Sequence, residues 1–395
     1  MRVLHLIGTL DPTSGGVAQC VLQLSEVWDE MGHNSAIASL DAPDNDFLGQ
    51  IRFDTFGLAS VPSQADRKPL SLIERFGYSP DYVPWLRQHV ADYDLVLVHG
   101  LWNYLSIGAS RVLPGGSTPY AVLPHGMLDP WFKRQRIKHA VKSMLWPFFE
   151  GKLLREASAV LFTTEEEREL AAQSFRPYAV RARITPIGAE DVEPAPERQI
   201  AAFHAQVPGL ASQPFLLFMS RIHPKKGCDM LIEAYADLVA SGTDLNLVIA
   251  GPDQTGWRDT LEQIARSRGV ADRIVWPGML SGDAKWGAFR SAEAFILPSH
   301  QENFGIVVPE AMSCSRPVLI TNKVNLWREV EADGAGLICN DNRADIAAQL
   351  AAFNAMSPAL RAQMGANART SFEQRFRFKD AAVAMMRLFE EELVR

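Results

Sequence analysis

Short apolar runs alternate with longer amphipathic segments along the chain. A short run without polar alternation is typical of a parallel strand that is buried on both faces. Such runs predict strands at residues 3–7, 95–98, 120–123, 160–163, 215–219, 247–250, 274–276, 295–297 and 318–320. Helical patterns lie between them, for example at residues 17–31, 165–173, 228–238 and 258–268. This alternation predicts doubly wound parallel sheets of the α/β class.

The alternation occurs twice, on either side of a proline-rich segment. Residues 189–214 contain four prolines and no strand pattern, which indicates a linker. We therefore expect two Rossmann-like domains, at residues 1–190 and 200–378, that face each other across a cleft. Residues 379–395 place apolar side chains on one helical face. This pattern fits a last helix that packs back on the first domain, and it equally fits one that caps the second domain.

Composition and charge narrow the class of protein. The 395 residues suffice for two or three domains, and 47% hydrophobic with 22% charged residues is typical of a globular protein. The net charge of -7 argues against a nucleic-acid partner. No apolar run reaches the ~18 residues of a membrane span, and the first residues lack the pattern of a signal peptide. The four cysteines show no Cys-x-x-Cys spacing, so we expect a reduced, cytoplasmic protein without a zinc site.

Two glutamates stand eight positions apart after a predicted strand. Glu302 follows the strand at residues 295–297, and Glu310 falls in a predicted helix. Because ligands of open α/β sheets bind at the carboxyl ends of strands, both carboxylates are placed to face one ligand. Gly305 lets the backbone approach that ligand closely. Carboxylates that accept several hydroxyls suit a sugar, and the alternative is a surface loop with two ordinary glutamates.

A basic turn directly follows the strand at residues 215–219. Arg221 and Lys226 flank this turn. Arginine binds phosphate with two parallel hydrogen bonds, and lysine supplies a mobile point charge. Together they suit a diphosphate that must depart as an anion. The alternative is a solvated basic turn.

Two features follow predicted strands of the first domain. Gly15 and Gly16 end the loop before the first helix, where exposed amides attract anions. The loop lacks the dinucleotide spacing and the Walker lysine, so we expect a looser phosphate or acceptor loop, with a packing turn as the alternative. His125 follows the strand at residues 120–123, where a neutral imidazole can hydrogen-bond a sugar hydroxyl or serve a structural role.

The segment at residues 131–149 is basic and aromatic. Residues 131–142 carry five basic side chains and no acid, and aromatic residues stand at both ends. Such a helix can lie on an anionic membrane, and the alternative is a solvated basic face over a buried aromatic cluster. The Asp-x-Asp segments at residues 44–46 and 92–94 do not follow a strand end. We therefore expect no required metal.

Taken in order, these motifs resemble those of the retaining glycosyltransferases of the GT-B fold, family 4, over nearly the whole chain. The resemblance implies that Arg221 and Lys226 bind the donor diphosphate, that Glu302 holds hydroxyls of the transferred sugar and that Glu310 binds the nucleotide ribose. It places His125 over the sugar and implies that the last helix crosses back to the first domain. The other implied donor-binding positions are Gly15, Gly16, Gly278, Met279, Leu280, Asn303, Phe304, Gly305 and Ile306.

Residues 125–131 and the basic stretch after them are similar to bacterial enzymes that build exopolysaccharide or O-antigen units. The resemblance implies a hexosyltransferase that takes GDP-mannose or a UDP-hexose and uses no metal or other cofactor. The acceptor is then a glycan or a polyprenyl-diphosphate-linked sugar, met at the inner face of the membrane. We expect front-face displacement, because no carboxylate is an evident nucleophile. The alternatives are an epimerase or phosphorylase on the same fold and a non-catalytic nucleotide-sugar-binding protein.

Overall fold

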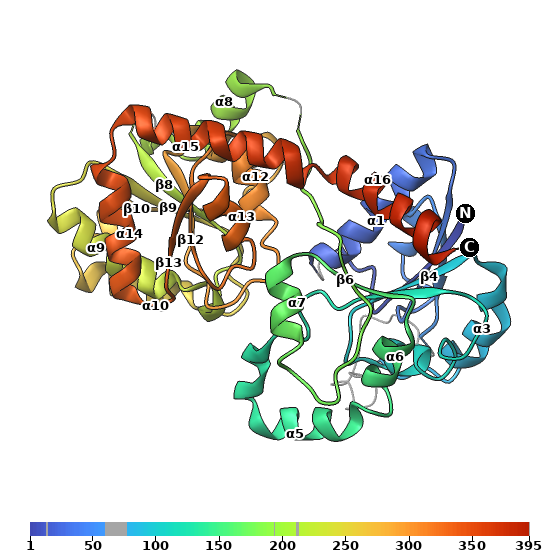
Figure 1. Cartoon of the computed structure of the whole chain (residues 1–395). Coiled ribbons are helices and arrows are strands. Elements are labelled where there is room, and N and C mark those ends of the chain that lie inside the picture. Colours follow the sequence, from blue (N-terminus) through green and yellow to red (C-terminus); the bar gives the residue numbers. More distant parts are fainter. Residues whose placement is uncertain (13–14, 60–76, 193, 211–212, 395) are drawn as a thin grey trace. The chain divides into compact units, whose positions relative to one another are not determined.

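The computed structural model describes residues 1–12, 15–59, 77–192, 194–210 and 213–394. These residues form two compact units, each built around its own sheet (Figure 1). Unit 1 comprises Met1–Pro186 and Lys379–Arg395, and unit 2 comprises Ile187–Phe378. All strand pairs are parallel, with helices between successive strands. The predicted α/β class with two Rossmann-like domains is therefore confirmed.

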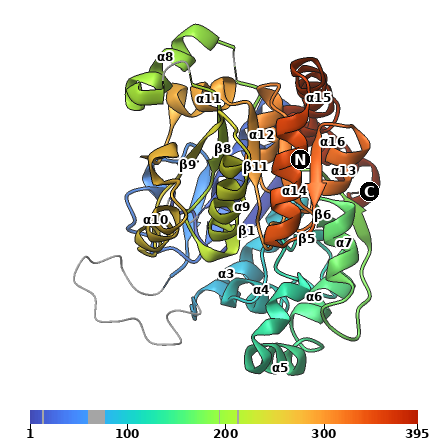
Figure 2. The same ribbon diagram turned by 90° about the vertical axis from the view of Figure 1, so that its left-hand side faces the viewer.

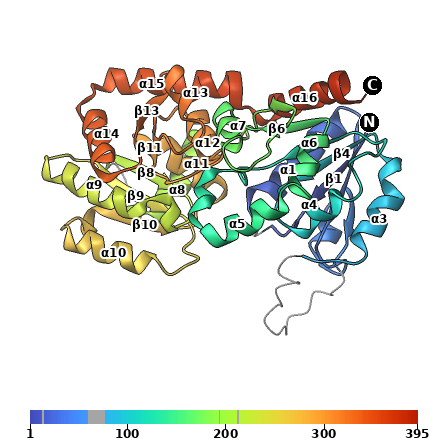
Figure 3. The ribbon, with the colours of Figure 1, turned by 60° about the horizontal axis from the view of Figure 1, so that its bottom comes forward.

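Unit 1 contains a seven-stranded sheet in the order β3-β2-β1-β4-β5-β6-β7. Its strands are β1 (Arg2–Ile7), β2 (Asn34–Ser39), β3 (Asp54–Gly57), β4 (Leu95–His99), β5 (Tyr120–Leu123), β6 (Ala159–Phe162) and β7 (Ala182–Ile184). Its helices include α1 (Gly16–Glu30), α3 (Tyr82–His89), α4 (Tyr104–Ala109), α5 (Arg136–Leu145), α6 (Glu150–Glu156), α7 (Glu165–Ala171) and most of α16 (Phe378–Leu388). Helices α3, α4 and α6 pack together beside this sheet (Figure 3).

Unit 2 contains a six-stranded sheet in the order β10-β9-β8-β11-β12-β13. Its strands are β8 (Phe215–Met219), β9 (Asn246–Ala250), β10 (Ile274–Gly278), β11 (Ala294–Leu297), β12 (Val318–Thr321) and β13 (Gly336–Cys339). Its helices include α8 (Pro196–Gln206), α9 (Cys228–Ala240), α10 (Arg258–Ser267), α11 (Gly282–Ser291), α12 (Val307–Ser313), α13 (Trp327–Ala332), α14 (Arg343–Ala355) and α15 (Pro358–Ser371). Helices α9, α10 and α14 pack together (Figure 2).

The strand order places a topological switch point in each sheet. In unit 1 the order reverses between β1 and β4, and in unit 2 it reverses between β8 and β11. At such a point neighbouring strands send their connections to opposite faces, which opens a crevice at their carboxyl ends. The loops after β1 and β4, and those after β8 and β11, are therefore the places where the fold favours a ligand.

Every strand predicted from an apolar run is present, and the described part of the chain contains four more. The additional strands are β2, β3, β7 and β13. Strand β2 is buried along five of its six residues, yet it consists mostly of small or polar residues around Ile37. Strands β3, β7 and β13 lie toward the edges of the sheets and are only partly buried or exposed. Their short, mixed sequences explain why the apolar pattern missed them.

The segment that we interpret as a linker contains a helix of unit 2. Helix α8 begins at Pro196, and Phe203 on this helix is fully buried. Helix α8 packs closely on α11, because a Cβ added at Gly287 would stand 1.9 Å from the carbonyl oxygen of Gln199. The linker interpretation of residues 189–214 was therefore wrong, since proline at the first helical position starts a helix as readily as proline elsewhere breaks one.

The last helix packs on α1 of unit 1. Trp28 donates its indole N–H to the carbonyl oxygen of Ala382 over 2.9 Å, and its ring meets Phe389 edge-on at 5.9 Å. Lys379 pairs with Glu30 over 2.7 Å. Because Trp28 is fully buried, the helix completes the core of unit 1 rather than capping unit 2.

Candidate active site

The basic turn after β8 is fixed against the end of β11 in unit 2. The backbone N–H of His300 donates to the carbonyl oxygen of Lys225 over 2.9 Å. Gly227 has a φ of 68°, and a Cβ there would stand 2.2 Å from the carbonyl oxygen of Pro298. Only glycine fits this close, left-handed position. The loops after β8 and β11 therefore meet at the switch point.

Lys226 and Glu302 form an ion pair between these two loops. The Lys226 side chain is 9% exposed and the Glu302 side chain 19% exposed. Burial, reinforced by the charges of Lys225 and Arg221, lowers the pKa of Lys226 from 10.5 to about 7. Contact with the Glu302 carboxylate acts in the opposite direction, because it stabilises the charged ammonium. Arg221 itself is exposed in the same turn, so its guanidinium is accessible to an anion.

The loop that carries Glu302 is anchored to the segment after β12. The Glu302 N–H donates to the carbonyl oxygen of Lys323 over 2.9 Å, and the Asn325 N–H donates to that of Glu302 over 3.1 Å. Gly305 turns this loop into α12 with a φ of 67°. Asn303 is partly exposed and Ile306 is exposed, whereas the Phe304 side chain is buried in the core. The loop can thus offer its backbone and the Glu302 carboxylate to a ligand.

Glu310 on α12 is paired with a lysine that the sequence motifs did not reveal. Its Oε1 accepts a hydrogen bond from Nζ of Lys285 on α11 over 2.6 Å. Its Oε2 is buried without a hydrogen-bond partner among the described residues. Burial raises the pKa of Glu310 above 4.5, and Lys285 opposes that rise. The unsatisfied oxygen is a ready acceptor for a hydroxyl.

The loop after β10 brings three further predicted residues to the same edge of the sheet. Gly278 ends β10 with a φ of 77°, and Met279 is 71% exposed. The Leu280 side chain is buried, so this residue can meet a ligand only through its backbone. Only glycine fits at position 251 after β9, because a Cβ there would lie 1.8 Å from the carbonyl oxygen of Ser220.

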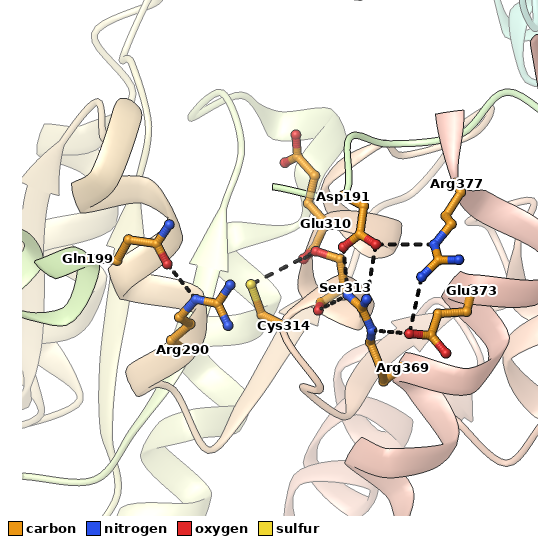
Figure 4. Close-up of polar contacts among 9 residues, drawn as sticks. All are labelled: Asp191, Gln199, Arg290, Glu310, Ser313, Cys314, Arg369, Glu373 and Arg377. Atoms are coloured by element: carbon orange, nitrogen blue, oxygen red, sulfur yellow. Dashed lines mark hydrogen bonds and ion pairs between the residues drawn. The ribbon is translucent and has the colours of Figure 1, made fainter. Parts of the chain in front are cut away.

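An ion network anchors the C-terminal end of α12 (Figure 4). Arg369 donates to both oxygens of Asp191, over 2.7 and 3.0 Å, and to the carbonyl oxygen of Ser313 over 2.8 Å. Arg377 also donates to Asp191 over 3.1 Å. Burial acts to raise the pKa of Asp191, but the two arginines outweigh it and hold that pKa below 3.8. No dashed line in Figure 4 joins the Glu310 carboxylate to this network, and its Oε1 pairs with Lys285 instead.

In unit 1, His125 is the outermost of three linked histidines. Its Nε2 lies 3.1 Å from Nδ1 of His99, and Nε2 of His99 lies 3.0 Å from Nδ1 of His5. Burial lowers the pKa of His125 to about 4, so its imidazole is neutral at neutral pH. His125 itself is partly exposed and has a φ of 49°. Neither His5 nor His99 was among the predicted site residues.

The glycine loop lies at the start of α1, beside the switch point of unit 1. Gly15 is the N-cap residue of α1 and has a φ of 118°. A Cβ added at Gly15 or Gly16 would meet nothing within 4 Å. A role of this loop in binding a phosphate or an acceptor stays a prediction.

Helix α5 and the turn before it expose both apolar and basic side chains. No residue of α5 is buried. The exposed apolar residues of α5 are Ile137, Val141 and Met144, and Phe148 is exposed just beyond the helix. Lys142 lies 4.4 Å from the centre of the Trp102 ring, and the buried Trp146 and Phe175 rings stack with centroids 4.8 Å apart. The aromatic cluster and the exposed basic face thus occur together.

Within the described residues, no group of three or more His, Cys, Asp or Glu side chains is arranged to hold a metal ion. In the same part of the chain, no helix combines the length and apolar character needed to cross a membrane.

The site residues fall into two sets, one in each unit. Unit 2 brings together the predicted donor residues Arg221, Lys226, Glu302 and Glu310 at one sheet edge, and unit 1 carries Gly15, Gly16 and His125. Residues 15–188 match the glycosyl transferase 4-like domain, and residues 201–371 match the glycosyl transferases group 1 family. The chain is built of two glycosyltransferase domains.

Known proteins resemble these glycosyltransferase domains at different levels. The alpha-D-kanosaminyltransferase of Streptomyces kanamyceticus is 30% identical over 221 residues, which cover 55% of this chain and 56% of that protein. The chain thus spans little more than half the length of such a curated relative. A solved structure of sucrose-phosphate synthase from Thermosynechococcus elongatus has a TM-score of 0.77 at 20% identity, covering 99% and 98% of the two chains.

The Anabaena protein HepE, solved in complex with UDP and glucose, has a TM-score of 0.74 at 18% identity. This similarity covers 99% of the chain and 100% of HepE. At such identities the comparison establishes the fold. Together with the two parallel sheets, it assigns the glycosyltransferase domains to the GT-B fold.

Proposed function

We propose that this protein is a retaining glycosyltransferase that moves a hexose from GDP-mannose or a UDP-hexose to a saccharide acceptor. The observation that carries the proposal is the Lys226–Glu302 ion pair at the switch point of unit 2, with Arg221 exposed beside it. A cation and a carboxylate at this point match the two halves of such a donor, which are a diphosphate and a polyhydroxylated sugar. HepE, which shares the fold, is solved with UDP and glucose.

Donor binding would redistribute the partners of Lys226 and Glu302. The diphosphate takes the Lys226 ammonium and the Arg221 guanidinium, because both are stronger partners for a multiply charged anion than one carboxylate is. Glu302 then accepts hydrogen bonds from sugar hydroxyls. The unpartnered Oε2 of Glu310 accepts a hydroxyl of the ribose. The diphosphate and the sugar thereby replace the Lys226–Glu302 contact, and the ribose gives Oε2 of Glu310 a partner.

The proposed chemistry is front-face displacement. With the donor bound, Glu302 accepts hydrogen bonds from sugar hydroxyls and Glu310 still pairs with Lys285, so neither carboxylate acts as the nucleophile that a double displacement needs. The bond from the anomeric carbon to the diphosphate breaks, and Arg221 and Lys226 stabilise the departing charge. The acceptor oxygen bonds to the anomeric carbon on the face that the diphosphate leaves, and an oxygen of the leaving phosphate takes the acceptor's proton. The positive charge at the leaving group comes from these side chains, and we propose that turnover needs no metal.

The proposed acceptor is a glycan or a polyprenyl-diphosphate-linked sugar at the inner face of the cytoplasmic membrane. Helix α5 supports this assignment, because Ile137, Val141, Met144 and Phe148 expose apolar surface on a segment rich in lysine and arginine. Apolar groups that enter the lipid boundary next to cations that attract anionic headgroups are typical of interfacial helices. The product would be an exopolysaccharide or O-antigen unit.

The test is a transfer assay with the purified full chain and a panel of nucleotide sugars. We expect one donor to release its nucleoside diphosphate only when a lipid-diphosphate-linked saccharide is present, with chelator in the buffer. Nuclear magnetic resonance of the product should show the donor's anomeric configuration. Inversion would contradict the retaining mechanism, and tight donor binding without transfer or hydrolysis would favour a binding protein.

A further inference from the structure

His5, His99 and His125 form a continuous chain through unit 1. His5 lies on β1, His99 ends β4 and His125 follows β5, which are neighbouring strands. The nitrogen–nitrogen distances are 3.0 Å between His5 and His99 and 3.1 Å between His99 and His125. The rings stack with centroids 5.2 and 5.4 Å apart. This spacing matches the separation of about 4.8 Å between adjacent strands.

All three rings are neutral at neutral pH. Burial lowers the pKa of His5 to about 3 and the pKa of His125 to about 4. Burial, together with the two neighbouring histidines, holds the pKa of His99 well below 6.5. Each neutral imidazole carries one N–H and one acceptor nitrogen. The three histidines therefore carry three N–H protons, of which two lie in the two hydrogen bonds between them.

Only two arrangements of these protons satisfy both hydrogen bonds. In the first, Nδ1–H of His5 donates to His99, and Nδ1–H of His99 donates to Nε2 of His125. The third proton is then on Nδ1 of His125. In the second, His125 donates from Nε2 to His99, and His99 donates from Nε2 to His5. The third proton is then on Nε2 of His5.

The buried end of the chain distinguishes the two arrangements. Nε2 of His5 is buried against the Trp28 ring, with ring centroids 5.4 Å apart, and has no partner among the described residues. The second arrangement leaves an unsatisfied N–H at this atom, and the first leaves an unsatisfied lone pair. Orphaned buried N–H groups are the rarer of the two in proteins, so the first arrangement is favoured.

We propose that His99 and His5 are positioning residues that hold His125 as the Nδ1–H tautomer. Nδ1–H of His125 then serves as a hydrogen-bond donor to an oxygen of a substrate bound at the carboxyl end of β5, and His125 does not act as a base. Its side chain is partly exposed, and Nδ1 makes no hydrogen bond to the described residues, so this donor is accessible. The ligand in this proposal rests on the proposed glycosyl transfer, whereas the tautomer does not.

The tautomer is measured on the ligand-free full chain by long-range nitrogen–proton correlation with nitrogen-15-labelled histidine. The signals of His125 are identified by their loss in His125→Gln. We expect a protonated Nδ1 and an unprotonated Nε2 at neutral pH. An unprotonated Nδ1 at His125 would mean that the two hydrogen bonds are donated in the opposite direction, from His125 toward His5, which overturns the proposal.

Two variants at His99 test the positioning role. His99→Phe keeps a flat ring but removes the donor to His125, so we expect His125 to shift toward the Nε2–H tautomer. His99→Gln can donate its amide N–H to His125 and accept from His5, so the Nδ1–H tautomer should persist. His89→Phe, on the surface of α3, is the control and should leave the spectrum of His125 unchanged. An unchanged tautomer in a folded His99→Phe protein would contradict the role of His99.

Turnover supplies the second measurement. We expect kcat to fall about tenfold in His99→Phe with KM nearly unchanged, and to recover in part in His99→Gln, as for one lost hydrogen bond. Equal losses in both variants would indicate a merely structural role. If the wild-type protein transfers no sugar, the proposed function fails, while the tautomer measured in the spectrum still stands or falls independently.

Discussion

The Lys226 ammonium and the Glu302 carboxylate form an ion pair across the switch point of unit 2, although 76 positions separate them in the sequence. Both side chains are largely buried, so each neutralises a charge that would otherwise be costly at this place. The pair also keeps both groups oriented toward the edge where the fold favours a ligand. The proposed donor exchanges this pair for contacts with its diphosphate and its sugar.

Lys226→Ala should lower kcat by about 10²–10³, the usual loss when one group that stabilises a departing charge is removed. Glu302→Ala should also lower kcat, and the double variant should lose little more than Lys226→Ala, because the two residues act as a unit. Lys323→Ala removes an exposed lysine beside the same loop and should leave kcat unchanged. Steady-state kinetics with the best donor checks these values. A folded Lys226→Ala protein with wild-type turnover would refute the mechanism.

Turnover should fall as the pH rises, with an apparent pKa well below the 10.5 of an ordinary lysine. Burial, with the charges of Lys225 and Arg221, lowers the pKa of Lys226 to about 7. Below that pKa the ammonium is present to stabilise the leaving diphosphate, and above it the charge is lost. In Lys226→Arg the decline should vanish from the profile of kcat/KM against pH, because guanidinium stays charged. A decline that persists in Lys226→Arg would assign it to another group.

The stability of unit 2 should respond to pH in the opposite direction. Between the folded and unfolded pKa values of Lys226, the unfolded chain binds a proton that the folded chain releases. The contribution of this residue to the free energy of unfolding therefore rises with pH across that window. Urea unfolding of the wild-type protein and of Lys226→Met measures the difference, and we expect the wild type to gain stability relative to the variant as pH increases. An equal response of both proteins would contradict the burial of the ammonium.

Gly227→Ala should destabilise unit 2 strongly, because the new Cβ would meet the Pro298 carbonyl oxygen at 2.2 Å in a left-handed conformation. We expect a loss of about 3 kcal/mol or more. Gly242→Ala is the matched control, since Gly242 also has a positive φ but nothing within 4 Å of a Cβ. It should lose about 1–2 kcal/mol, the conformational cost alone. Equal losses in urea unfolding would show that the loops after β8 and β11 do not meet as described.

Removing charge from α5 should weaken binding to anionic liposomes. Each basic residue near such a surface contributes about 1 kcal/mol, so the pair Arg136→Gln and Lys138→Gln should lower partitioning by roughly tenfold or more. The pair Arg87→Gln and Arg155→Gln removes the same charge from exposed sites on α3 and α6. This control should bind like the wild type in a sedimentation assay. Equal effects of both pairs, or none, would refute a specific membrane contact through α5.

The sequence predicted those parts of the fold that one local pattern encodes. Residues 215–219 form a strand with the predicted bounds, because a short continuous apolar run is typical of a parallel strand buried on both faces. The apolar pattern did not predict strand β2, because this strand is buried by its position between β1 and β3 and has few strongly apolar residues. Helix α8 was not predicted, because Pro196 was interpreted as a helix breaker rather than as the first residue of a helix.

The candidate site was predictable where charged residues directly follow a strand, as at Arg221 and Glu302. Partners brought in from a distance were not. Lys285 meets Glu310 from another helix, 25 positions away, and His5 meets His99 from 94 positions away. A lysine in an amphipathic helix or a histidine in an apolar strand has no local pattern that indicates such a partner. Only the packing of α11 on the sheet and the pairing of β1 with β4 create these contacts.

In the proposed function, unit 2 binds the nucleoside diphosphate part of a sugar donor. The most direct test is thermal unfolding of the wild-type protein and of Lys226→Ala with GDP, UDP, ADP and dTDP, without added metal. A nucleotide at about 100 times its Kd adds about 2.7 kcal/mol of stability, which is easily measured. We predict that one nucleotide stabilises the wild type clearly and that Lys226→Ala loses most of this effect. No stabilisation by any of the four, or an equal effect in the variant, would contradict the account.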